Sequence, residues 1–201
     1  MFLRLLLMGY SQSSLAILGK SADSVLDTLK LHRTGEREEF PESPLVAATL
    51  LNGWFLLVAD RAEHSLIRDN TLRQLSIGCE IVTCTVEEHV MFSEATCWRD
   101  GHQVWRVTHS AHLGIEHLET QGELPPIFGD IRDRLCSKQQ VAGGPKAGFD
   151  CIFDIPVELA RMLTGYRYSK NIDGSNDHPF ETLTKTSASD GSSFWKRLFG
   201  A

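Results

Sequence analysis

Two carboxylates and an imidazole stand together in Glu87-Glu88-His89, inside a β-type stretch from 79 to 98. On a regular strand, Glu87 and His89 share one face and Glu88 lies on the other, among mostly apolar residues. A carboxylate on that core side is costly unless paired, and its pKa rises. Such a residue hints at a functional site. A bulge that turns Glu88 to solvent, or a partner such as Arg106, would explain it without function.

The histidines and cysteines do not follow a metal-binding pattern. His109 and His112 are three residues apart, a spacing that converges on a helix, but their segment is typical of a strand and separates them onto opposite faces. Cys79 and Cys84 are five apart, and there is no Cys-x-x-Cys, whereas structural zinc sites have tighter spacing. We therefore predict no metal and no cofactor.

A catalytic interpretation rests on few residues. The chain has no Gly-x-Ser-x-Gly motif, and no cysteine stands out with a histidine as a nucleophile. A small hydrolase would have to use groups within residues 87–112. The candidates are Glu87, Glu88, His89 and His109.

The segment 14–21 (SLAILGKS) ends in Gly-Lys-Ser before a helix, as a phosphate-binding loop does. However, Ser14 replaces the first glycine, and the bulky residues that follow would keep backbone N–H groups from wrapping around a phosphate. We therefore interpret Ser21 as the N-cap of a helix over 22–31.

The C-terminal end combines aromatic and basic residues after a polar stretch. Residues 169–193 are rich in Ser, Asn, Asp, Gly and Thr, which predicts a flexible linker. In 194–201, one helical turn would place four apolar side chains on one side. Such a segment suits docking into a groove of a partner, and folding back on its own domain or fraying are the alternatives. These predicted interaction residues are Phe194, Trp195, Leu198 and Phe199.

Two short turns indicate hairpins. Asn52-Gly53 separates the apolar runs 45–51 and 54–59, and Asp100-Gly101 follows the stretch 79–98, in which we expect a break near 86–89. If the second loop is Asp100-Gly101 alone, Thr96 opposes Trp105, so that Trp98 and Trp105 share a face.

The remaining elements complete an α+β prediction. We expect a mainly antiparallel sheet, with hairpins at 52–53 and 100–101, packed against several short helices. Residues 1–168 form one domain, followed by the linker 169–193 and the amphipathic segment 194–201. The expected helices are 22–31, 69–75, 127–140 and 156–164. The other expected elements are a strand or helix at 2–8, a turn at 9–14, a loop at 34–44 and a strand at 151–155.

Composition narrows the function classes. The chain has 201 residues, a net charge of −6 and five cysteines. An acidic chain without basic runs disfavours nucleic acid as a partner. Few cysteines, no signal-peptide pattern and no apolar run long enough to span a membrane favour a reduced, cytoplasmic setting.

The stretch 78–124, together with Asp154-Ile-Pro-Val-Glu-Leu-Ala and Leu163-Thr-Gly-Tyr166, resembles a family of uncharacterised bacterial proteins of about this length. The resemblance implies a bacterial, cytoplasmic protein, and it implies no activity and no site residues.

The leading interpretation is a non-enzymatic protein-interaction domain of the immunity or adaptor type, which binds a protein through the C-terminal segment or an aromatic patch. The alternative is the small hydrolase.

Overall fold

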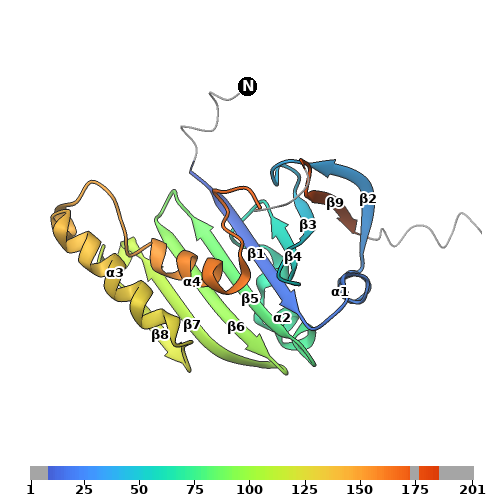
Figure 1. The fold of residues 1–201 in the computed structure, drawn as a ribbon, viewed down its shortest axis with the longest axis horizontal. Coiled ribbons are helices and arrows are strands. Elements are labelled where there is room, and N and C mark those ends of the chain that lie inside the picture. The colour runs from blue at the N-terminus through green and yellow to red at the C-terminus, as the bar shows by residue number, and fades with distance from the viewer. Residues whose placement is uncertain (1–8, 173–176, 186–201) are drawn as a thin grey trace, which may run out of the picture.

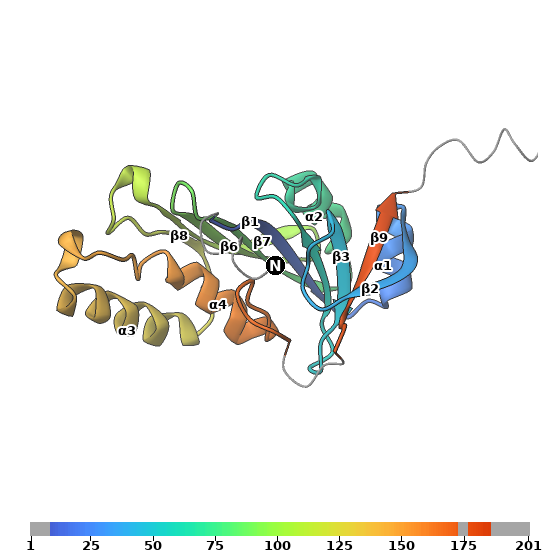
Figure 2. The same ribbon diagram turned by 90° about the horizontal axis from the view of Figure 1, so that it is seen from above.

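The computed structural model describes residues 9–172 and 177–185, which form one antiparallel sheet with helices on both faces (Figures 1 and 2). The strands are β1 (Ser11–Leu18), β2 (Leu31–Glu38), β3 (Leu45–Thr49), β4 (Phe55–Ala59), β5 (Glu80–Glu87), β6 (Phe92–Arg99), β7 (His102–Ser110), β8 (Glu119–Gly122) and β9 (Phe180–Lys185). The helices are α1 (Ala22–Leu29), α2 (Asp69–Leu75), α3 (Ile127–Val141) and α4 (Asp154–Thr164). In these residues the sheet order is β2-β9-β3-β4-β1-β5-β6-β7-β8, which confirms the predicted α+β class.

The centre of the sheet is buried on both faces. In β1, Leu15 and Ile17 pack on the side of α1 and α2, whereas Ala16 packs on the side of α3 and α4. Figure 2 shows α3 and α4 on one side of the sheet and α2 on the other. A strand covered on both faces needs apolar residues at every position rather than at alternate ones, which explains the continuous apolar run of β4.

Both predicted hairpins are present. The chain turns between β3 and β4 at residues 50–54, where Gly53 has a φ of 88°. Between β6 and β7, Asp100 and Gly101 both have positive φ, at 48° and 81°, as a two-residue hairpin turn requires. The expected break in the 79–98 stretch is a third hairpin, because β5 ends at Glu87 and β6 begins at Phe92.

The two tryptophans do not share a face, contrary to our prediction. Trp98 pairs with Gln103 as expected, but Trp105 pairs with Cys97 because the register shifts between Cys97 and Trp98. A one-residue bulge turns every later side chain to the other face of its strand. Trp98 therefore packs on the α1/α2 side, and Trp105 packs on the α3/α4 side.

The turn predicted at 9–14 is wrong from Ser11 onward, because β1 begins there. The serine hydroxyls that favour turns are used inside the structure instead. Ser13 Oγ donates to the carbonyls of Arg61 and Ala62, each at 2.8 Å, and Ser14 Oγ donates to the carbonyl of Cys84 at 3.2 Å. Satisfied hydroxyls allow the serines to stay in a buried strand.

The predicted loop at 34–44 is also wrong at its start, where residues up to Glu38 belong to β2. This strand lies at the edge of the sheet and leaves most of its charged side chains exposed, as edge strands commonly do. Its register shifts between Arg33 and Arg37, around Gly35, whose φ is 84°.

The predicted linker 169–193 contains β9, which inserts between β2 and β3 (Figure 1). The sheet of the predicted 1–168 domain thus takes in a strand from beyond residue 168. Pairing on both sides satisfies the backbone of β9, and its side chains Phe180 and Leu183 are buried in opposite layers of the core. The predicted linker is polar when its composition is taken as a whole, and this overall polarity conceals a strand of six residues. The predicted element at 2–8 and the segment 194–201 lie outside the described residues.

The predicted strand at 151–155 is a turn that leads into α4. Asp150 causes it, because one carboxylate oxygen, Oδ1, accepts the backbone N–H groups of Ile152 at 2.9 Å and Phe153 at 3.0 Å. A short side chain that accepts these N–H groups replaces the missing partners at a helix start and favours a turn over a strand.

Candidate functional site

Glu87 and His89 form a surface pair at the turn between β5 and β6. His89 Nδ1 lies 2.6 Å from Glu87 Oε1, and the side chains keep 55% and 24% of their surface exposed, His89 first. Burial raises the pKa of Glu87, but hydrogen bonds from Ser11 and His89 outweigh it and hold the pKa below its ordinary value. The carboxylate is therefore a stabilised anion and a weak base.

Glu88 follows neither explanation considered from the sequence. It is half-buried, and its Oε2 accepts the backbone N–H of Tyr10 at 2.8 Å while its Oε1 accepts the hydroxyl of Tyr168 at 2.7 Å. Arg106 lies elsewhere, 3.6 Å from Glu94. Glu88 thus ties the end of β5 to the chain before β1 and to the segment after α4.

Little space remains beside Glu88 and the two tyrosines that it binds, Tyr10 and Tyr168. The cavity next to Tyr168 and Cys84 has a volume of about 10 Å³, which is about the minimum for one water molecule. Burial raises the pKa of the Cys84 thiol to about 12, so the thiol stays protonated and unreactive at neutral pH. A substrate cannot enter this cavity to reach Cys84 or Tyr168.

His109 is fully buried on β7, with its ring edge-on to Phe153 at 6.3 Å between centroids. Its Nδ1 lies 2.7 Å from the carbonyl oxygen of His117, and Nδ1 must donate because a carbonyl only accepts. Its Nε2 lies 3.0 Å from Oδ2 of Asp150, although these atoms are not aligned as a hydrogen bond. An unprotonated Nε2 would turn a lone pair toward the carboxylate oxygen at this distance, so the contact favours a proton on Nε2.

Asp150 supplies the negative charge of this pair. Its side chain is 6% exposed. Burial raises the pKa of Asp150, but contact with His109 and the hydrogen bonds from Phe153 and Ile152 outweigh burial and lower it. The lowered pKa keeps Asp150 ionised, and its Oδ2 faces Nε2, so we infer that Nε2 is also protonated and that the pair is a buried imidazolium and carboxylate. With both nitrogens protonated, His109 has no lone pair to act as a base.

A second buried side chain fixes the same segment. Gln139 on α3 is fully buried; its Nε2 donates to the carbonyl of Gly144 at 2.8 Å, and its Oε1 accepts the backbone N–H of Cys151 at 2.7 Å. Gln139 and Asp150 together hold the 144–151 connection against α3 and the sheet. Sequence reasoning missed both, although an aspartate just before a helix is a capping signal.

The four catalytic candidates do not converge. His109 pairs with Ser93, which pairs with Val86, so His109 lies one position away from Glu87 in strand register. Adjacent positions on a strand point to opposite faces. His109 is enclosed in the core, whereas Glu87 and His89 are at the surface.

The other sequence candidates also have structural roles. Ser21 caps α1 as predicted, with its hydroxyl accepting the N–H of Ser24 at 3.3 Å, and Lys20 Nζ donates to the carbonyl of Leu75 at 2.6 Å. His109 lies on β7, and His112 lies in the 3-10 helix that follows. In the described residues, no group of three or more potential ligands is placed to hold a metal ion.

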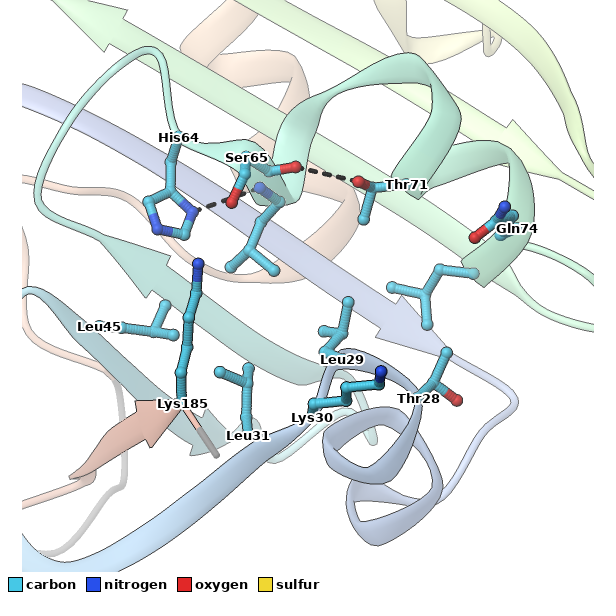
Figure 3. A pocket seen from close by; sticks show the side chains of 12 residues that line it. Thr28, Leu29, Lys30, Leu31, Leu45, His64, Ser65, Thr71, Gln74 and Lys185 are labelled. Atoms are coloured by element: carbon cyan, nitrogen blue, oxygen red, sulfur yellow. Dashed lines mark hydrogen bonds between the residues drawn. The ribbon is translucent and has the colours of Figure 1, made fainter. Parts of the chain in front are cut away.

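A separate cavity of about 240 Å³ lies between α1 and α2, and sequence reasoning did not find it (Figure 3). Its walls come from the end of α1, the starts of β2 and β3, the segment 64–75 and the end of β9. Two lysines and one histidine line it: Lys30, His64 and Lys185. None of the described lining residues is acidic. The polar side chains surround an apolar interior, which is the usual composition of a small-molecule pocket.

Comparisons of the chain with protein-family models, with curated proteins and with solved structures find no match. The resemblance to an uncharacterised bacterial family therefore stays a prediction. Across residues 9–172 and 177–185, no helix is long and apolar enough to cross a membrane.

Proposed function

We propose that this chain is a non-enzymatic protein-interaction domain, of the immunity or adaptor type, that works in the bacterial cytoplasm. The observation that carries this proposal is the complete burial of His109, which holds Asp150 and the His117 carbonyl instead of facing a substrate. Glu88 is used in the same way by Tyr10 and Tyr168. Two of the four candidate residues, His109 and Glu88, thus hold parts of the fold together.

A surface suited to a protein partner lies around the C-terminal end of α3. Val141, Leu113 and Phe149 expose 91%, 69% and 52% of their surface. A hydrogen bond of 2.8 Å from Gln140 to Glu116 joins the 111–117 segment, which contains Leu113, to the end of α3, which carries Val141. The Lys138 ammonium on α3 lies 5.7 Å from the centroid of the Phe149 ring. Exposed apolar groups gathered in one place are typical of interaction sites. The segment 194–199 is a second proposed contact.

The test is to isolate a protein that copurifies with the full chain and to titrate it into the purified chain by calorimetry. We expect Val141→Ser and Phe149→Ser each to weaken binding about tenfold, the loss typical of an apolar contact at the centre of an interface. Leu51→Ser is the matched control, because Leu51 is 79% exposed but lies in the β3–β4 loop. Truncation after Ser193 tests the C-terminal contact.

Two outcomes would contradict the proposal. One is that neither surface variant nor the truncation changes the affinity of any copurifying protein. The other is a hydrolytic activity of the purified chain that is lost in both Glu87→Gln and His89→Gln, which would favour the hydrolase alternative.

A further inference from the structure

The 240 Å³ cavity between α1 and α2 is not lined by Leu113, Val141 or Phe149, and it has an apolar floor with a polar mouth. Its floor consists of side chains that are less than a tenth exposed: Leu31, Leu45, Leu66 and Leu75. Lys30 and Lys185 are exposed and therefore lie at the mouth. A ligand in this cavity would have its apolar part covered and its polar part at the mouth.

His64 presents a hydrogen-bond donor to this cavity. Its Nδ1 accepts the backbone N–H of Leu66 at 3.3 Å, so in the neutral ring the proton is on Nε2. Burial lowers the pKa of His64, and the charges of Arg61 and Lys185 lower it further and outweigh the opposite effect of Asp60, which keeps the ring neutral at pH 7. Nε2–H is left to donate to another group.

Lys185 places a positive charge next to that donor. Its charge acts on His64, and Figure 3 shows its side chain extending toward the His64 ring. Within the described part of the chain, no hydrogen bond or salt bridge of the Lys185 ammonium is found. An ammonium and an N–H at one end of a cavity without acidic lining residues favour an anion, even in a chain of net charge −6.

The size of the cavity limits the rest of the ligand. An apolar cavity of about 150 Å³ holds benzene, so 240 Å³ accommodates a body of that size together with a carboxylate. A long acyl chain would be too large, and inorganic phosphate would leave the leucine floor uncovered. We propose that this cavity binds a small organic carboxylate, with its anionic group at His64 and Lys185 and its apolar body on the leucines.

The test uses benzoate as the anionic probe and benzyl alcohol as its neutral control, titrated into the full chain by calorimetry and by amide chemical shifts. We expect saturable benzoate binding, with shifts confined to the lining segments, and at least tenfold weaker binding of benzyl alcohol. Lys185→Gln should weaken benzoate binding about tenfold, the loss of one charge-assisted hydrogen bond. Lys146→Gln, an exposed lysine outside the cavity lining, should change nothing.

The proposal fails if benzoate and benzyl alcohol bind equally, if the shifts spread over the whole surface, or if Lys185→Gln binds benzoate like the unchanged chain. It also fails if inorganic phosphate competes as strongly as benzoate, because the apolar body would then contribute nothing. Since Lys185 is exposed, its variant should keep the melting temperature of the parent, which shows that a lost affinity is not lost folding. None of these outcomes depends on a protein partner.

Discussion

Replacing Asp150 by asparagine isolates the charge of the buried pair. The asparagine would keep the size of the side chain and an oxygen that accepts the N–H groups of Ile152 and Phe153. It would remove the negative charge 3.0 Å from His109 Nε2, in a place where the side chains of Asp150 and His109 are 6% and 0% exposed. The imidazolium would then be buried without a counter-ion.

Breaking a buried ion pair by removing one partner costs about 3–5 kcal/mol. For a chain of this length, each kcal/mol lowers the melting temperature by roughly 2–4 °C, so Asp150→Asn should lower it by roughly 6–20 °C. Asp150→Ala should cost about 1 kcal/mol more, because it also removes the acceptor at the start of α4.

Thermal and urea unfolding measure this loss directly. Asp133→Asn is the control, since Asp133 is 69% exposed and pairs with Arg132 at the surface; it should move the melting temperature by less than about 2 °C. The double variant His109→Gln/Asp150→Asn should be less destabilised than the sum of the single variants, because both charges are gone. A melting temperature of Asp150→Asn within about 2 °C of the parent would refute the buried ion pair.

Three further predictions concern stability. Truncation before Phe180 removes β9 and should cost more than about 3 kcal/mol, since two large buried side chains are lost; native-like urea unfolding of the truncated chain would contradict this. Gly122→Ala should disrupt the β7–β8 contact, because the added Cβ would lie 2.0 Å from the Val104 carbonyl oxygen and the backbone has a φ of 78°. Unchanged hydrogen exchange of the β8 amides would contradict this prediction. Because the folded-state pKa of Asp150 is lowered, its contribution is complete above the ordinary carboxyl pKa and disappears as pH falls through the lowered value. Acid titration of Asp150→Asn should therefore show a shallower loss of stability below about pH 4 than the parent.

Elements specified by neighbouring residues were predictable. The Asp100-Gly101 hairpin follows from a turn that needs two positive φ angles, and α2 appears over 69–75 as expected. The Ser21 cap depends on a hydrogen bond to a residue only three positions away. In each case the sequence pattern and the stabilising contact lie within a few residues of one another.

Elements specified by distant contacts were not predictable. β9 is a strand because β2 and β3 pair with it, and those partners lie more than a hundred residues earlier in the chain. The bulge before Trp98 depends on how β6 and β7 fit together rather than on a residue pattern. The same limit applies to the site, since the contact that defines the role of His109 is with Asp150. The cavity at Lys185 is assembled from four separate stretches of the chain, at 28–31, 45, 64–75 and 185.

The protonation state of the His109 ring tests most directly whether this histidine serves the fold or a reaction. In a long-range ¹⁵N–¹H spectrum of the full chain at pH 7, assigned through contacts to Phe153, both ring nitrogens should have the shifts of protonated nitrogens. Their protons should exchange slowly with solvent, because the ring is fully buried between Asp150 and the His117 carbonyl. An unprotonated ring nitrogen, with a rapidly exchanging proton on the other, is what a general base requires and would contradict the structural role of His109.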